Sequence, residues 1–232
     1  MVNLLLASTS TVHGGTYLDY LEAEVRAHFH GAQQLVFIPF ARPGGISHND
    51  YAALAEKRFQ SWGFSMRGLH RFENMQKALE DADGVFTGGG NTFVLLKQLY
   101  DLDLLLVLKA RVQTGMPYMG SSAGSNLAGL TVGTTNDMPI VYPPSFNALQ
   151  AVPFNINPHY LDPVPGSKHM GETRETRINE FHHFNTQPVV GLREGSWLHV
   201  QGNQVHLKGE LPARLFRQGQ APEECAPGLL RL

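Results

Sequence analysis

Short apolar runs alternate with helix-length amphipathic segments through the first 130 residues of this chain of 232. We expect strands at residues 3–7, 34–39, 64–69, 84–87 and 117–119, and helices at 17–29, 47–62, 74–81, 92–100 and 102–113. Alternation with short connections is typical of a parallel sheet covered by helices on both faces. The sequence therefore predicts a three-layer α/β fold with a mostly parallel sheet.

The pattern changes after residue 130. We expect strands at 153–157 and 188–192, a helix at 172–184 and a long surface loop at 160–171, where proline and glycine are frequent. Residues 196–216 alternate apolar and polar side chains around Gly202-Asn203, which indicates a C-terminal antiparallel hairpin. Neither a repeat nor a low-complexity linker divides the chain, so we assign residues 1–232 to a single domain.

Composition excludes several classes of partner. The formal net charge is −2 and no basic block occurs, so we expect no nucleic-acid partner. The apolar runs fall far below the ~20 residues that span a bilayer, and a signal peptide's basic start is missing, so we expect no membrane association. The one cysteine, Cys225, cannot form an internal disulfide, which fits a reducing compartment. We expect a soluble cytoplasmic protein, as a monomer or a homodimer.

A Gly-x-Ser-x-Gly pattern, Gly120-Ser121-Ser122-Ala123-Gly124, follows the apolar run 117–119. A strand, a sharp turn with a serine and a helix form a nucleophile elbow. The glycines suit unusual backbone angles and close approach of the helix. The serine would stand at a helix N-terminus, which favours developing negative charge. The alternative is a tight β–α turn with a capping serine.

A serine nucleophile needs a base and a group that orients the base. His159 follows a predicted strand at its carboxyl end, whereas His169 lies in the long loop. We expect the following histidines at the surface or at helix ends: His13, His28, His30, His48, His70, His182 and His183. Glu194 follows the strand at 188–192, and Asp137 is the competing acid. The order Ser–His–Glu differs from that of the α/β-hydrolases.

A glycine run, Gly88–Gly90, follows the strand at 84–87 and leads into Asn91. Its alternative interpretation is a phosphate cradle. A Walker lysine and a ribose-binding acid are both missing, so we expect no nucleotide cofactor. The histidines lack ligand spacing, so we expect no metal and no other cofactor.

Six sequence blocks occur in order along the chain: Gly88-Gly89-Gly90-Asn91-Thr92, Gly120-Ser121-Ser122-Ala123-Gly124-Ser125-Asn126, Thr134-Thr135-Asn136-Asp137-Met138-Pro139-Ile140, Ile156-Asn157-Pro158-His159, Gly171-Glu172-Thr173-Arg174 and Gly191-Leu192-Arg193-Glu194-Gly195-Ser196-Trp197. They resemble the blocks of the peptidase E (α-aspartyl dipeptidase) family, serine peptidase family S51, and the resemblance runs from about residue 3 to 216. The resemblance implies a flavodoxin-like or class I glutamine amidotransferase-like fold. It also implies a serine dipeptidase that cleaves dipeptides with an N-terminal aspartate.

Matched block by block, Ser122 resembles the family's nucleophile, His159 its base and Glu194 its third member. Asp137 remains the runner-up acid, because related subfamilies are thought to use an aspartate. Ser121 departs from the pattern, since bacterial members have tryptophan there, and this should alter the pocket wall. We expect backbone N–H groups of Gly89 and Ala123 to form the oxyanion hole.

An aspartate-selective pocket needs a cation for the substrate carboxylate, and guanidinium pairs with it bidentately. Arg174 matches the family block, and Arg177 lies one turn further along the same helix. Asn91 and Asp137 are candidates for binding the free amino group. Rival hypotheses are a cyanophycinase-like peptidase or an esterase on the same scaffold, and a non-catalytic ligand-binding relative.

Overall fold

The predicted parallel strands form the centre of an eight-stranded sheet in the computed structural model, which describes residues 1–163, 166, 168 and 170–232. The strands of this sheet are β1 (Asn3–Ala7), β2 (Leu35–Ile38), β3 (Met66–Gly68), β4 (Gly84–Thr87), β5 (Tyr118–Ser121), β8 (Trp197–Gln201), β9 (Gln204–Lys208) and β12 (Gly228–Leu229). Their spatial order is β12-β9-β8-β1-β5-β4-β2-β3. The five strands from β1 to β3 in this order run parallel, and β8, β9 and β12 extend the sheet antiparallel.

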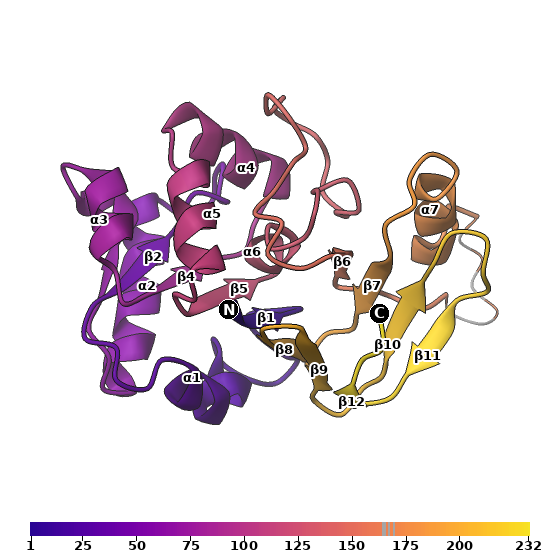
Figure 1. Cartoon of the computed structure of the whole chain (residues 1–232), viewed down its shortest axis with the longest axis horizontal. Helices are drawn as coiled ribbons and strands as arrows, with labels where there is room; N and C mark the ends of the chain where they lie inside the picture. The colour runs from indigo at the N-terminus through magenta and orange to yellow at the C-terminus, as the bar shows by residue number, and fades with distance from the viewer. Residues whose placement is uncertain (164–165, 167, 169) are drawn as a thin grey trace.

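Helices cover both faces of this sheet (Figure 1). Leu5 of β1 packs with α1 (Glu22–His28) and α2 (His48–Ser61) on one face. Leu4 packs on the other face with α3 (Met75–Asp81), α4 (Thr92–Asp101) and α5 (Leu105–Gln113). Successive residues of a strand point to opposite faces, so one apolar run supplies both cores. The predicted three-layer α/β class is confirmed.

The start of the first helix differs from the prediction. The backbone of Leu18 is left-handed, with φ of 60°, and a short 3₁₀ turn, η1 (Asp19–Leu21), precedes α1. Asp19 accepts the backbone N–H of Thr16 at 2.7 Å, and no side chain caps the start of α1. By contrast, Ser47 accepts the N–H of Asp50 and caps α2.

A second, four-stranded sheet was not predicted. It contains β6 (Asn155–Pro158), β7 (Val189–Leu192), β10 (Ala213–Phe216) and β11 (Glu223–Cys225), in the order β11-β10-β7-β6. Helix α7 (Arg174–Phe181) packs on it through Ile178. Of the expected hairpin at 196–216, β8 and β9 form the hairpin in the large sheet, whereas β10 belongs to the small sheet, shown beside α7 in Figure 1.

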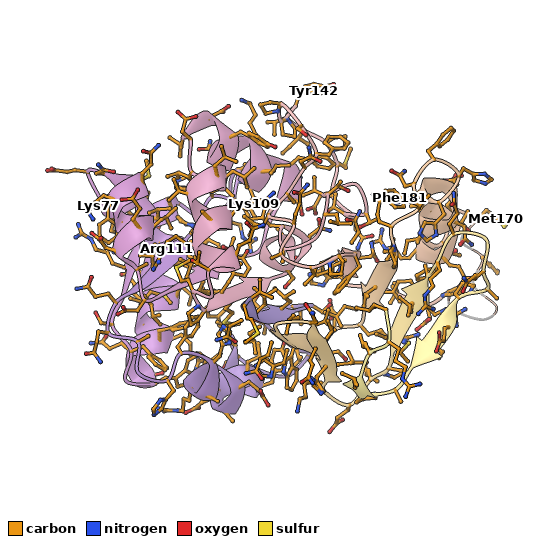
Figure 2. The ribbon with its side chains drawn as sticks, in the orientation of Figure 1. Lys77, Lys109, Arg111, Tyr142, Met170 and Phe181 are labelled. Carbon is orange, nitrogen blue, oxygen red and sulfur yellow. The ribbon has the colours of Figure 1, made fainter. Side chains whose placement is uncertain are left out.

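The connection from α6 (Ala123–Asn126) to β6 is buried at both ends and exposed in its middle, and α6 is a single turn. Tyr142 in this connection is 88% exposed, and Figure 2 shows it at the outer edge of the molecule. Part of the predicted loop at 160–171, including His169, lies outside the described residues. Among the helices described, none has the length and apolar character needed to cross a membrane.

Candidate active site

Ser122 occupies a sharp turn between β5 and α6. Its backbone angles, φ 53° and ψ −112°, are strained, and its N–H donates to the carbonyl of Ala7 at 3.0 Å. A Cβ on Gly120 would lie 2.4 Å from the carbonyl oxygen of Gly124, and one on Gly124 would lie 2.2 Å from that of Thr87. A side chain at either position would clash with backbone atoms, so both positions require glycine. The Ser122 hydroxyl makes no capping hydrogen bond with α6, which excludes the capping-serine alternative.

His159 lies between Ser122 and Glu194. Its Nε2 is 2.9 Å from the Ser122 hydroxyl, and its Nδ1 is 2.6 Å from Oε1 of Glu194. An ionised carboxylate only accepts hydrogen bonds, so Nδ1 carries the proton and Nε2 is free to accept from the serine. The three side chains thus have the hydrogen-bonded order that a nucleophile, a base and an orienting acid require.

The backbone at His159 is also strained, with φ of 52°. Two neighbours stabilise this conformation. Ser8, which is fully buried, accepts the N–H of His159 at 2.9 Å, and the side-chain amide of Asn136 donates to the Pro158 carbonyl at 2.6 Å. Strain at a functional residue persists only where its surroundings hold it.

Ala7 and Ser8, at the carboxyl end of β1, form hydrogen bonds with the segments that carry Ser122, His159 and Glu194. The Ser8 hydroxyl donates to the carbonyl of Leu192, two residues before Glu194, at 2.7 Å. The carbonyl of Ala7 accepts the N–H of Ser122 and, at 2.6 Å, the hydroxyl of Ser125. The sequence predicts only a polar turn at Ser8. Its role depends on long-range contacts with two strands of the second sheet.

The glycine run approaches Ser122 closely. A Cβ on Gly89 would lie 3.0 Å from Cβ of Ser122. The N–H of Gly88 donates to Ile38 and that of Asn91 to Ala41. Within the described chain, the N–H groups of Gly89, Gly90 and Ala123 have no hydrogen-bond acceptor. Gly89 and Ala123 therefore provide free donors beside the nucleophile, as an oxyanion hole requires.

Asp137 lies at the N-terminus of α4, away from the imidazole. Its Oδ2 accepts the N–H of Thr92 at 2.7 Å and the hydroxyl of Thr135 at 3.0 Å, and the structure gives it no hydrogen bond to His159. Asn91 caps α4 through Oδ1 and donates through Nδ2 to the Met138 carbonyl. Both amide atoms of Asn91 are thus occupied, whereas Oδ1 of Asp137 has no hydrogen-bond partner among the described residues.

Arg174 is half-buried and forms no ion pair within the described part of the chain. Burial lowers the pKa of its guanidinium, the neighbouring Arg177 lowers it further, and Asp137 opposes the shift. Arg177 is exposed and lies 3.6 Å from a carboxylate oxygen of Glu172. Arg174 is therefore the better placed of the two for an external carboxylate.

A charged network supports the segment around Glu194. Arg193 contacts both carboxylate oxygens of Asp162, at 2.7 and 2.8 Å, and both of Glu224, at 3.0 and 2.9 Å. Arg214 bonds to Glu224 and, on α7, to Glu175 at 3.0 Å. The network joins the segment after His159 to β7, β10, β11 and α7.

Two of the histidines expected at the surface or at helix ends lie at helix ends and are buried there. His28 contacts the Tyr118 carbonyl through Nε2 at 3.2 Å, and His182 contacts that of Gln187 at 3.1 Å. Each lies at the end of a helix whose last turn faces a core, which polar neighbours in the sequence do not indicate. Among the described residues, no three His, Cys, Asp or Glu side chains form a group suited to a metal ion.

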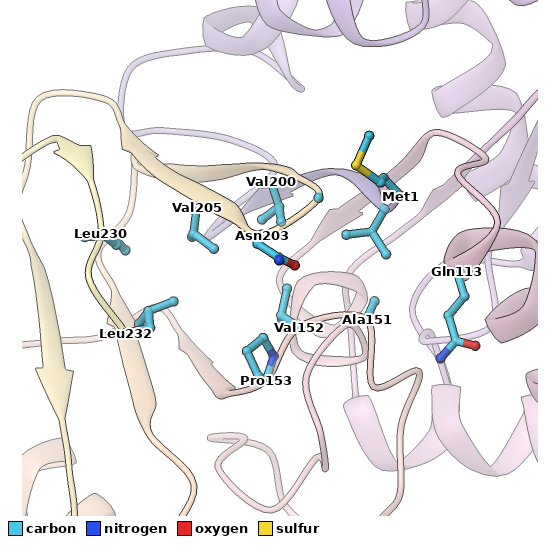
Figure 3. Close-up of a pocket in the computed structure, with 12 residues that line it drawn as sticks. Met1, Gln113, Ala151, Val152, Pro153, Val200, Asn203, Val205, Leu230 and Leu232 are labelled. Atoms are coloured by element: carbon cyan, nitrogen blue, oxygen red, sulfur yellow. The ribbon is translucent and has the colours of Figure 1, made fainter.

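A cavity of about 550 Å³ lies at the opposite end of β1 from Ser8 (Figure 3). Val152, Val200, Val205 and Leu230 contribute apolar lining. In parallel α/β sheets, reactive groups gather at the carboxyl ends of the strands. This cavity lies at the amino end of β1 and is separate from the Ser122 region.

Comparison with known proteins identifies the family from sequence and the fold from a solved structure. The model of Peptidase family S51 matches residues 4–208. A protein of Streptomyces coelicolor named Peptidase E is 50% identical over 98% of this chain and 92% of its own. A Drosophila melanogaster protein named probable alpha-aspartyl dipeptidase is 47% identical over 97% and 94%. The crystal structure of a peptidase from an acI-B1 actinobacterium, only 15% identical, shares the fold with a TM-score of 0.71, over 97% of this chain and 94% of that one.

Proposed function

This chain belongs to peptidase family S51, and from that premise we propose that it is a serine dipeptidase that hydrolyses dipeptides with an N-terminal aspartate. One observation carries the proposal. Ser122, His159 and Glu194 form a continuous hydrogen-bonded chain at a strained elbow, beside two free backbone N–H groups. The relatives that are named for aspartyl dipeptide cleavage or as peptidase E match nearly the whole chain.

The first step is acylation. The Ser122 hydroxyl attacks the carbonyl of the aspartyl residue, and Nε2 of His159 takes its proton. Glu194 accepts from Nδ1, which keeps the imidazole oriented and stabilises the imidazolium. The oxyanion accepts hydrogen bonds from the N–H groups of Gly89 and Ala123. Loss of one such donor costs about 10²–10³ in rate.

The second step releases the products. The imidazolium gives its proton to the leaving nitrogen, and the second amino acid departs as a free amine. Water then attacks the aspartyl ester of Ser122, with His159 again as the base. The His159 side chain is 38% exposed, so water reaches the imidazole without a large rearrangement.

Arg174 supplies the cation for the aspartyl side chain, because it is half-buried and carries no internal ion pair within the described residues. The free amino group of the substrate pairs with the unoccupied Oδ1 of Asp137, which lies close enough to Arg174 to influence its pKa. Asn91 is not available for this role, because its amide binds backbone atoms on both sides.

Kinetics on matched peptides test the proposal. We expect efficient cleavage of Asp-Leu and much slower cleavage of Asn-Leu, Glu-Leu and N-acetyl-Asp-Leu. Equal rates on Asp-Leu and Glu-Leu would contradict the Arg174 pocket, and preference for an ester would favour the esterase hypothesis. Ser122→Ala should abolish hydrolysis, whereas the matched control Ser61→Ala alters an exposed serine bonded within α2. Hydrolysis by the Ser122→Ala variant would refute the mechanism.

We further propose a cytoplasmic location, which the single cysteine supports, because one thiol cannot form an internal disulfide. Fractionation of cells that produce the protein tests this. We propose a monomer or a homodimer, which light scattering distinguishes.

A further inference from the structure

A second cavity lies beside Tyr51, the residue whose hydroxyl bonds to the glycine run. It has a volume of about 430 Å³. Ser10 and Thr11, just beyond β1, line one side, and Arg42 and Ile46 from the loop between β2 and α2 line another. Tyr51 of α2 completes the wall. Its lining therefore comes from the carboxyl ends of two parallel strands, the edge where Ser122 also lies.

Tyr51 connects this cavity directly to the proposed oxyanion loop. Its hydroxyl donates to the carbonyl of Gly89 at 3.2 Å. A Cβ on Gly88 would lie 2.5 Å from the same hydroxyl oxygen, so the phenol packs against the glycine run without a gap. Gly89 in turn faces Ser122. One side chain thus contacts both the cavity and the glycine run that faces Ser122.

Arg42 provides a positive charge in this cavity. The guanidinium carbon lies 5.2 Å from the centre of the Tyr51 ring. Arg42 has no salt bridge to any carboxylate in the described chain. Burial raises the pKa of Tyr51, and the Arg42 charge opposes that rise, as expected for a guanidinium near the phenol oxygen. A cation without an anionic partner, next to the Ser10 and Thr11 hydroxyls, favours an external anion.

The cations Arg42 and Arg174 lie toward opposite ends of the glycine run. Arg174 is near Asp137, which bonds to Thr92 just after the run, whereas Arg42 is near Tyr51, which bonds to Gly89. An Asp-X dipeptide carries two carboxylates, one on the acyl side of the scissile bond and one at its C-terminus.

We propose that Arg42 binds the C-terminal carboxylate of the substrate, so that the cavity is the subsite for the leaving amino acid. This inference rests on the proposed dipeptidase function. A guanidinium recognises a planar carboxylate with two parallel hydrogen bonds. The cavity thereby selects substrates in which the residue after the scissile bond carries a free C-terminal carboxylate. This feature distinguishes a dipeptide from a longer or amidated peptide.

The test compares Asp-Leu with Asp-Leu amide, which differ only in the C-terminal charge. Wild-type enzyme should cleave the free acid with a kcat/KM about 10–100-fold higher, the range for a hydrogen-bonded ion pair. Arg42→Gln should lower kcat/KM for Asp-Leu by that factor, mainly through KM, and leave the amide nearly unchanged. Arg42→Lys should restore part of the difference. The matched control is Arg67→Gln, an arginine that also stacks on an aromatic ring, 4.4 Å from the centre of Phe72 at the far edge of the sheet.

Three outcomes would overturn the inference. An equal loss of kcat/KM on Asp-Leu and on Asp-Leu amide in the Arg42→Gln variant would indicate that Arg42 has a structural role. Loss of selectivity for Asp-Leu over Asn-Leu, with the acid–amide difference intact, would place the aspartyl side chain at Arg42. An Arg67→Gln variant with the same acid-specific loss would remove the connection with this cavity. If wild-type enzyme cleaves neither compound, the dipeptidase proposal itself fails, a result distinct from the other three.

Discussion

The hydroxyl of Ser8 accepts a hydrogen bond from the backbone nitrogen of His159 at 2.9 Å. It donates to the carbonyl of Leu192 at 2.7 Å. One fully buried side chain from the large sheet thereby joins the two strands of the small sheet that lead to the base and to the acid. The geometry of the site consequently depends on a residue that cannot touch the substrate.

Removal of this hydroxyl should reduce both stability and turnover. Ser8→Ala leaves a buried N–H and a buried carbonyl without this partner, so we expect a loss of about 1–3 kcal/mol in the free energy of unfolding. Because His159 is displaced, kcat should fall more than KM changes, and labelling of Ser122 by a fluorophosphonate should slow. Urea denaturation and labelling rates measure these effects. Ser61→Ala, an exposed serine bonded within α2, is the control.

Glu194 and Asp137 should respond differently to loss of charge. Glu194→Gln keeps the shape but disturbs the imidazole tautomer, so we expect kcat to fall by about 10²–10⁴-fold. Asp137→Asn should mainly raise KM, because Asp137 bonds to the start of α4 and faces Arg174. Steady-state kinetics of both variants decide between the two acids. A larger fall in kcat for Asp137→Asn would favour Asp137.

The Arg193 network should contribute measurably to stability. The Arg193 side chain is 13% exposed and contacts two carboxylates, whose hydrogen bonds raise its pKa. Lysine cannot reproduce this fork geometry, so Arg193→Lys should lower the free energy of unfolding by about 1–3 kcal/mol. Arg26→Lys, in an exposed helical pair with Glu22, should cost less than about 0.5 kcal/mol. Equal costs for the two variants would show that the network adds little.

His28 should make stability depend on pH below neutrality. Burial lowers its pKa to about 3, with a further contribution from His199, and the hydrogen bond to Tyr118 opposes the shift. The unfolded chain takes up this proton near pH 6.5, whereas the folded chain does not until about pH 3. Acidification therefore favours unfolding, by about 2 kcal/mol between pH 7.5 and 5.

Thermal melting across this pH range tests the role of His28. His28→Gln keeps a side-chain donor for the Tyr118 carbonyl and removes the titration, so its melting temperature should fall less on acidification than that of the wild type. His30→Gln, at an exposed neighbouring position, should retain the wild-type slope. A wild-type slope in His28→Gln would assign the effect to other groups.

The parallel half of the fold could be predicted because its strands are short apolar runs buried on both faces. The small sheet could not be predicted from the sequence. β6 pairs with β7, and β7 with β10, across long intervening segments. β11, which forms a hairpin with β10, consists of Glu223, Glu224 and Cys225, which local propensity does not place in a strand. Glu224 is stabilised there by ion pairs with Arg193 and Arg214. Pairing partners that are distant in sequence leave no local pattern.

Residues of the candidate site could be predicted from the sequence where a local backbone feature, such as a glycine-flanked turn or a strand end, accompanies the reactive side chain. Ser122 lies between obligatory glycines, and His159 and Glu194 follow strand ends. Ser8 and Arg42 carry no such signal, since a serine in a turn and an arginine in a loop are common at protein surfaces. Their importance follows from contacts across the fold, with His159 for one and with Tyr51 for the other.

The carboxyl end of β1 also bears on when the enzyme becomes active during synthesis. The carboxyl end of β1 leaves the ribosome well before the residues that it bonds at the site, Ser122, His159 and Leu192. Its antiparallel neighbour β8 ends at Gln201. Contacts so far apart in sequence form late in folding. A chain in which β6 and β7 have not yet formed therefore lacks the contacts through which Ser8 holds the backbone at His159 and Leu192.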